Sequence, residues 1–207
     1  TIYQNPVDGD EGTAPGTAFA YGGSQWQLAG GVAEIVGGAS WRQLWDQYIG
    51  EPCDLEVFQY GNNLFSATGW TGNPDDLIGL DNPNMEGGAI SNLDDYGKIL
   101  SMHLNDGSCG DNKVMSQASV EFMRIDRGTP VGGPGYGMGW WIQPAAEGEE
   151  AYLYTDSGFY AAMSWIDVSR DYAGYVQFED YTGASSATGF LVSELIPLIE
   201  EALDAVQ

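Results

Sequence analysis

With 207 residues, the chain is long enough to bury one sizeable core or two small ones. Only 6 residues are Lys or Arg against 30 Asp and Glu, and the resulting net charge of −24 repels nucleic acid and anionic membranes, so we expect neither as a partner. The 43% of hydrophobic residues excludes a disordered acidic tail, while the acidic excess favours a marine or halophilic source in which salt screens the self-repulsion.

The two cysteines, Cys53 and Cys109, bear on the cellular compartment. An even number in an acidic, glycine-rich chain fits an exported protein, so we expect a secreted, periplasmic or extracellular location. A disulfide between them would close a loop of about 55 residues and contribute roughly 4 kcal/mol; two buried free thiols are the alternative. The first residue is Thr1, which is compatible with a removed signal peptide, and no run of 18 apolar residues predicts a membrane span.

Residues 1–14 have no periodicity and predict an exposed leading segment. Its Asp8, Asp10 and Glu11 lack the ligand spacing of a calcium loop, so we interpret them as solvated charge and predict no metal site. No sequence pattern predicts a cofactor either.

A tight loop bearing Tyr21 precedes the first expected helix. Ser24 is the expected N-cap of a helix that begins near Gln25. The helical spacing of its apolar residues predicts one buried face, made of Trp26, Leu28, Ala29, Val32, Ile35 and Val36. A tyrosine held at this helix entrance can move protons if its surroundings stabilise the phenolate, although a tyrosine simply packed at a loop corner is the alternative.

Three more helices are expected before residue 130. The first covers residues 40–50, is capped by Ser40 and carries one packed face of Trp41, Leu44, Trp45, Tyr48 and Ile49. The second covers residues 92–104, where we interpret His103 as a partner of the helix dipole or a surface residue rather than a base. The third begins at Ser116. Residues 56–84 predict a long loop region of the kind that lines a site or an interface.

The last third of the chain changes to short segments rich in aromatic and β-branched residues. Strands are expected over residues 136–142, 151–155, 161–167 and 174–178, and three or four of them should form an antiparallel sheet. A closing amphipathic helix, bent at Pro197, should pack on that sheet. The expected fold class is α+β, mainly helix and loop over residues 15–130 and strands plus a C-terminal helix over residues 131–207.

Five short sequence segments, taken in their order along the chain, show a resemblance to a known family that no single one of them would show. They are PGTAFAYGGSQWQLAG from Pro15, the Asn82–Asn84 and Glu86–Ser91 turn, Asp94 to Tyr96 in the next helix, GYGMGW from Gly135, and Asp156-Ser157-Gly158. In this order they resemble the serine β-lactamase and penicillin-binding-protein superfamily, in particular its class C, D-aminopeptidase and esterase-like branch. The resemblance covers about residues 13–205 and implies a β-lactamase/transpeptidase-like fold.

The family is built around a Ser-x-x-Lys whose serine attacks an acyl group, while the lysine and a motif tyrosine move the proton. The resemblance implies that Tyr21 is this proton-transfer residue. It further implies substrate contacts at Gly23, Asp156, Ser157 and Gly158. The 207 residues contain no Ser-x-x-Lys. The resemblance therefore implies only the C-terminal part of the fold, with a sheet edge and an apolar surface that pair with an N-terminal portion or another chain.

Two positions depart from the family pattern. Gly23 stands at the motif asparagine and has no side chain to bind a substrate carbonyl, and Asp156 stands where Lys or His is expected. An acidic residue there disfavours anionic β-lactams and leaves ester or amide hydrolysis of a neutral substrate. The resemblance also makes Cys53 and Cys109 plausible neighbours and favours the disulfide.

Three functional hypotheses follow. The first is the C-terminal portion of a serine hydrolase that cleaves a small acyl substrate through an acyl-enzyme and is inactive without an upstream segment or partner chain. The second is a non-catalytic binding or structural module on a degenerate hydrolase scaffold. The third, an N-terminal nucleophile at Thr1, is disfavoured because the following residues lack the apolar strand pattern that would bury it.

Overall fold

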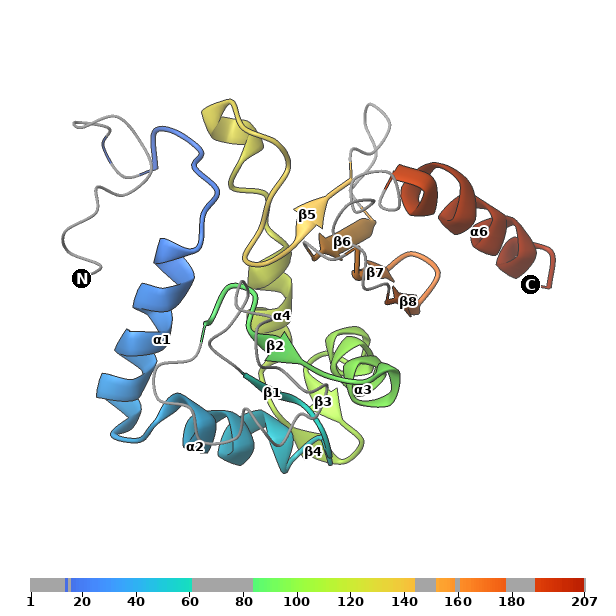
Figure 1. The fold of residues 1–207 in the computed structure, drawn as a ribbon. Coiled ribbons are helices and arrows are strands. Elements are labelled where there is room, and N and C mark those ends of the chain that lie inside the picture. The colour runs from blue at the N-terminus through green and yellow to red at the C-terminus, as the bar shows by residue number, and fades with distance from the viewer. Residues whose placement is uncertain are drawn as a thin grey trace, which may run out of the picture.

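The structure is a computed structural model that describes residue 14 and residues 16–60, 84–143, 152–158, 161–177 and 189–206. Helices and short hairpins come first along the chain and the main antiparallel sheet comes last (Figure 1). The fold is therefore α+β, as the sequence predicts. The leading segment, apart from Ala14, and most of the loop over residues 56–84 lie outside the described residues. Within the described part of the chain, no helix is long and apolar enough to cross a membrane.

Helix α1 (Ser24–Gly37) differs from its prediction in two ways. Its N-cap is Gly23 without a side-chain hydrogen bond, so the prediction of Ser24 as the cap is wrong. Its apolar face is not buried either, since Leu28, Val32, Ile35 and Val36 are between 46% and 83% exposed. The close contacts of α1 are made at glycines instead: a Cβ at Gly30 would lie 2.8 Å from Met85, and one at Gly37 would lie 2.6 Å from Leu44.

Helix α2 (Trp41–Trp45) runs directly into a π-helical turn, η2 (Asp46–Gly50). Ser40 caps α2 as predicted, with a reciprocal capping box between Ser40 and Gln43. Trp45 is buried, but Tyr48 is 58% exposed and does not join the packed face. The π-helical turn explains this error, because its wider hydrogen bonding rotates every later side chain away from the α-helical position.

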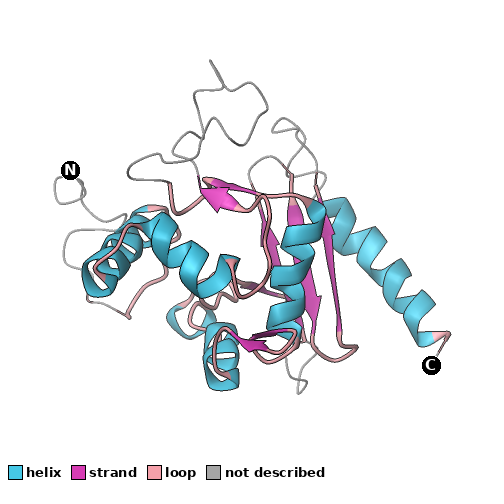
Figure 2. Cartoon of the chain, turned by 90° about the horizontal axis from the view of Figure 1, so that it is seen from below, coloured by secondary structure: helices cyan, strands magenta, loops and turns pink. Residues whose placement is uncertain are grey.

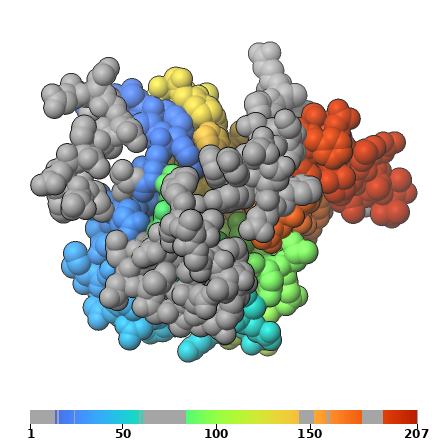
Figure 3. Space-filling view, viewed as in Figure 1, coloured from blue at the N-terminus to red at the C-terminus, as the bar shows by residue number. Residues whose placement is uncertain are grey.

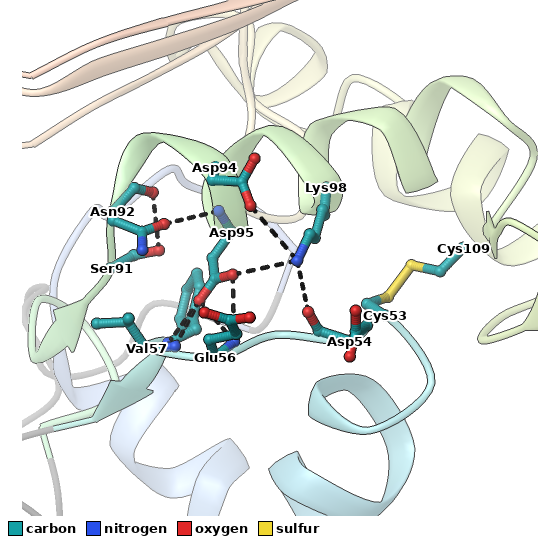
Figure 4. A network of polar contacts seen from close by, with 11 residues as sticks. Cys53, Asp54, Glu56, Val57, Ser91, Asn92, Asp94, Asp95, Lys98 and Cys109 are labelled. Atoms are coloured by element: carbon teal, nitrogen blue, oxygen red, sulfur yellow. Dashed lines mark hydrogen bonds and ion pairs between the residues drawn. A yellow bond between two sulfur atoms is a disulfide. The ribbon is translucent and has the colours of Figure 1, made fainter.

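Helix α3 (Leu93–Leu104) begins where the sequence predicts, with Asn92 as its N-cap. Strand β1 (Gln59–Tyr60) pairs with β2 (Ala89–Ile90) just ahead of it. The buried Asp95 carboxylate accepts the backbone N–H groups of Glu56, Val57 and Phe58 and lies 3.6 Å from the Lys98 ammonium (Figure 4). The first turn of α3 therefore holds the chain that leads into β1.

The end of α3 carries a correction and a confirmation. His103 is buried at 7% exposure and meets the Trp140 ring edge-on at 5.3 Å, so of the two predicted alternatives, a partner of the helix dipole or a surface residue, the surface residue is wrong. The last turn of α3 therefore packs against the segment that leads into β5. The short hairpin of β3 (Ser108–Cys109) and β4 (Asn112–Lys113) follows. The disulfide between Cys53 and Cys109 is present and joins this hairpin to the end of η2 (Figure 4).

Helix α4 (Gln117–Arg124), capped by Ser116 as predicted, and the short 3₁₀ turn η4 (Thr129–Val131) lead to the sheet. The sheet has the order β5-β6-β7-β8 with every pair antiparallel, from β5 (Trp141–Ile142), β6 (Leu153–Ser157), β7 (Met163–Asp167) and β8 (Tyr172–Val176). Four strands are thus confirmed. The first begins later than predicted, at Trp141, and the last begins earlier, at Tyr172.

Each face of the sheet has its own apolar cluster. On one face, Met163 and Trp165 pack with Leu191 and Ile196 of the C-terminal helical segment. On the other, Tyr154 and Ile166 pack with Leu100 of α3 and with Trp140. Seen from below, the strands lie between the C-terminal helix and the remaining helices (Figure 2).

The C-terminal segment is a π-helical turn, η5 (Leu191–Leu195), followed by α6 (Ile196–Asp204). Pro197 lies in the first turn of α6, where its missing N–H costs no helical hydrogen bond. Arg170 holds α6 to the sheet by bonding to Asp204 at 2.9 Å and to the buried Asp167 at 3.1 Å. In the space-filling view α6 and α1 form opposite edges of the visible face (Figure 3).

Candidate active site

The Tyr21 loop is held by aromatic contacts to the approach of β5. The Tyr21 ring lies 5.1 Å from Trp141 and 5.8 Å, edge-on, from Tyr136. Phe19 packs on the same two rings from the start of the loop, at 6.4 and 5.7 Å. Tyr21 itself remains 46% exposed. The loop is therefore fixed in place while the tyrosine stays accessible.

The sheet register brings this loop to the Asp156–Gly158 strand. Trp141, which contacts Tyr21, pairs with Thr155 in the ladder between β5 and β6. Asp156 is the next residue along β6 and pairs with Ser164 of β7. The two segments that the resemblance implies as second and third motifs are therefore linked through Trp141.

The charge of Asp156 acts on five tyrosines. Burial raises the pKa of the Asp156 carboxyl to about 6. Burial is the largest cause that raises the pKa of each of these tyrosines, and the Asp156 charge is the second largest for four of them. For Tyr136, the neighbouring Tyr21 raises the pKa more than Asp156 does. The five are Tyr21, Tyr60, Tyr96, Tyr136 and Tyr175. In the described chain the Tyr21 phenol is therefore protonated at neutral pH, and its use as a base requires a cation that these residues do not supply.

Glu86 occupies the place that a side chain at position 23 would take. A Cβ added to Gly23 would overlap the Glu86 carboxylate. The turn that carries Glu86 is held by Asn84, whose Oδ1 accepts the N–H of Glu86 at 2.9 Å, and by Gln27 of α1, whose Oε1 accepts the N–H of Met85 at 3.3 Å. The Glu86 charge also contributes to raising the pKa of Tyr21, after burial and Asp156. The sequence indicates Glu86 only as part of the turn before α3, and its place at the site is revealed by the contact with Gly23.

The end of β6 turns tightly after Asp156. Ser157 pairs with Met163, and the Gly158 N–H donates to the Ala162 carbonyl oxygen at 2.7 Å. A Cβ at Gly158 would lie 3.5 Å from Ala162, which is an ordinary contact, so packing in this chain does not require glycine there. Cys53 and Cys109, by contrast, are joined beside α3 and have a structural role.

Helical segments pack on both faces of the antiparallel sheet, and solved structures of the β-lactamase and penicillin-binding-protein class share this α+β fold. The Beta-lactamase family model matches residues 4–188. The chain therefore belongs to the β-lactamase family. No curated protein matches it by sequence at a significant level.

Solved structures share this fold at low sequence identity. A protein of Bacteroides dorei classed among the β-lactamases is 23% identical with a TM-score of 0.60, over 86% of this chain and 59% of its own. The octameric penicillin-binding protein homologue of Pyrococcus abyssi is 20% identical with a TM-score of 0.65, over 89% and 44%. Simvastatin synthase of Aspergillus terreus is 16% identical with a TM-score of 0.60, over 87% and 57%. The chain thus spans about half the length of these structures.

Proposed function

We propose that the chain is the C-terminal portion of a β-lactamase-related serine hydrolase that cleaves an ester or amide bond through an acyl-enzyme. The observation that carries this proposal is the meeting of the Tyr21 loop with β6 through Trp141 and Thr155. In this account Tyr21 transfers the proton, and Gly23, Asp156, Ser157 and Gly158 line the substrate position. The Gly158 N–H already bonds to Ala162, so Gly158 contacts substrate without acting as the oxyanion donor.

The nucleophile, in this proposal, comes from a Ser-x-x-Lys segment outside the 207 residues, either joined to this chain or on a partner. Two observations support it. None of the serines has a lysine three residues later, and the pKa of Tyr21 is raised by burial, by Asp156 and by Glu86. A lysine ammonium placed beside Tyr21 would oppose that shift and allow the phenolate to act as a base.

The substrate, in this proposal, carries no carboxylate next to the scissile bond. The Asp156 and Glu86 charges would repel an anionic group, which is the reverse of the lysine that the family offers. The disulfide favours an exported protein. The net charge of −24 favours a salt-rich setting.

A second candidate, a non-catalytic binding module, is favoured by the exposed apolar face of α1 and by the position of Glu86 where a motif asparagine would project. The two proposals differ in whether an acyl-enzyme can form.

Labelling of the native assembly with a fluorophosphonate probe tests the catalytic proposal. We expect a serine of the assembly to be labelled, and Tyr21→Phe to slow the labelling by about 10²-fold or more because the proton can no longer be transferred. Tyr48→Phe, which alters a tyrosine that is 58% exposed outside the site, is the matched control and should have no effect. An intact assembly that does not react with the probe would support the binding module instead.

A further inference from the structure

Asp156 is separated from the stacked rings of Tyr175 and Tyr96 by one small residue, Ser164. The register aligns Asp156, Ser164 and Tyr175 on adjacent strands, so the three side chains lie on one face of the sheet. Tyr96 of α3 stacks on Tyr175 at 4.2 Å, and its hydroxyl lies 3.5 Å from Ser164 Oγ. Strands are spaced by about 4.8 Å. One small ligand group could therefore contact both the Asp156 carboxylate and the stacked rings of Tyr96 and Tyr175.

A second aromatic group lies at the approach to β5. The Tyr21 and Tyr136 rings pack edge-on at 5.8 Å, and Trp141 lies 4.7 Å from Tyr136. The Asp156 charge contributes to raising the pKa of Tyr21 and of Tyr136 as well as of Tyr96 and Tyr175. Tyr21 and Tyr136, which come from other parts of the chain than Tyr96 and Tyr175, thus lie near enough to Asp156 for its charge to affect them.

The Asp156 carboxylate has no hydrogen-bond or ion-pair partner among the described residues, unlike the other shielded aspartates. Asp95 accepts three backbone N–H groups, Asp126 accepts those of Gly128, Thr129 and Tyr136, and Asp167 bonds to Arg170. Each of those carboxylates stabilises a turn or a helix end. Among the described residues, the Asp156 carboxylate makes no such contact.

None of the six Lys and Arg side chains, all of which lie in the described part of the chain, pairs with Asp156. The sequence has only six Lys and Arg residues, and the structure describes all of them in contacts elsewhere. Three form ion pairs with other acids and three donate to backbone carbonyl oxygens, as follows: Arg42 to Asp46, Lys98 to Asp94 and Asp95, Arg170 to Asp167 and Asp204, Lys113 to Asp106, Arg124 to His103, and Arg127 to Phe122 and Ile125. Among the described residues, the Asp156 carboxylate is therefore left without a cationic partner.

We propose that Asp156 and the surrounding tyrosines form a binding site for an alkylammonium group. A carboxylate supplies the opposite charge, and aromatic faces attract organic ammonium ions through their negative quadrupole. A hard metal ion is a poorer fit, because it requires several oxygen ligands and the described residues contain no group of three or more His, Cys, Asp or Glu that could hold one. That the ammonium belongs to a substrate rests on the proposed hydrolase function, whereas the binding itself does not.

The test is a binding titration of the 207-residue chain with choline and with its uncharged isostere 3,3-dimethylbutanol, at constant ionic strength set with NaCl. We expect choline to bind at least about tenfold more tightly than the alcohol, since a shielded carboxylate with aromatic faces is worth about this factor or more. Equal affinity for the two compounds would overturn the proposal. Because no turnover is measured, the outcome is independent of the fluorophosphonate test of the hydrolase proposal.

Matched variants locate the site. Asp156→Asn should abolish the preference for choline, whereas Asp111→Asn removes the same charge from an exposed turn between β3 and β4 and should leave it intact. Tyr175→Phe keeps the ring and should bind within about threefold of the parent chain, while Tyr175→Leu should lose about tenfold. Thermal unfolding shows whether each variant is folded. A preference for choline that persists in folded Asp156→Asn would also overturn the proposal.

A second titration, of the native assembly with choline, distinguishes two sources of the ammonium group. If a substrate supplies it, choline should bind the native assembly as tightly as the isolated chain. If the lysine of the proposed nucleophile segment supplies it, choline should bind the chain alone and be excluded from the assembly. Either result supports the ammonium site, and absence of binding to both overturns it.

Discussion

The Asp95 carboxylate accepts the backbone N–H of Phe58 at 3.0 Å, although the two residues are 37 positions apart in the sequence. The N–H groups of Glu56 and Val57 donate to the same carboxylate, and Lys98 lies 3.6 Å away (Figure 4). Burial raises the pKa of Asp95, but the bonds from Val57, Glu56 and Phe58 and the charge of Lys98 outweigh it, so the pKa is lowered overall. This contact stabilises the ionised form and ties the start of β1 to α3.

Asp95→Asn should lower the free energy of unfolding by about 2 to 4 kcal/mol, because an amide offers one acceptor oxygen and turns a donor toward N–H groups. Asp94→Asn is the control on the same helical turn, where the side chain is 83% exposed, and should cost about 0.5 kcal/mol or less. Urea denaturation at neutral pH measures both. Equal effects of the two substitutions would contradict the assigned role of Asp95.

The Cys53–Cys109 disulfide closes a loop with a sequence separation of 56. Replacing both cysteines with serine should lower the free energy of unfolding by roughly 4 kcal/mol, because the unfolded chain regains the entropy of the open loop. Denaturation of the oxidised parent and the double variant gives the difference. A loss below about 1 kcal/mol would mean that packing of the hairpin, rather than the disulfide, holds this region.

The Asp156 carboxyl should make the chain more stable as the pH falls through about 6. Its folded pKa is raised from the ordinary 3.8 to about 6 by burial, so the folded state binds this proton more tightly than the unfolded state. Ionised Asp156 therefore opposes folding above pH 6, and the penalty disappears progressively until the pH is below 3.8. Asp156→Asn should raise the free energy of unfolding at pH 7 by about 1 to 3 kcal/mol.

The difference in stability between Asp156→Asn and the parent should shrink as the pH is lowered toward 4. Because the two proteins are compared at the same pH, the contribution of the other negative charges cancels in this difference. Thermal unfolding of both proteins over pH 4 to 7 measures it. A variant that is less stable than the parent at pH 7 would show that the carboxylate supports the fold and would contradict this account.

Salt should stabilise the protein. Raising NaCl from about 0.1 to 1 M shortens the Debye length from roughly 10 to 3 Å and screens repulsion among the charges that make up the net −24. The unfolding temperature should rise and then level off as screening becomes complete. A midpoint that stays constant or falls over this range would contradict the proposed adaptation to salt.

Local sequence signals predicted the capped helices well. Ser40 and Ser116 cap the helices that follow them, since an N-cap hydrogen bond depends on residues three positions apart. The family resemblance predicted the disulfide between Cys53 and Cys109, which the structure contains. Neither the N-cap residues nor the family resemblance depends on which surfaces pack against the chain.

The errors have physical causes that lie outside local sequence. The spacing of Leu28 and Val32 shows which face of α1 can be buried, but burial requires a neighbouring surface that the described residues do not provide. Tyr48 was displaced by a π-helical turn. Glu86 entered the candidate site through one contact with Gly23, which no periodicity or motif indicates.

The most direct test of the central claim is the intact mass and peptide map of the natural assembly under denaturing conditions. The hydrolase account predicts a Ser-x-x-Lys segment, either joined to these 207 residues or in a companion polypeptide. A homogeneous species of 22.2 kDa without any companion would contradict it, because no acyl-enzyme could then form by the family's mechanism.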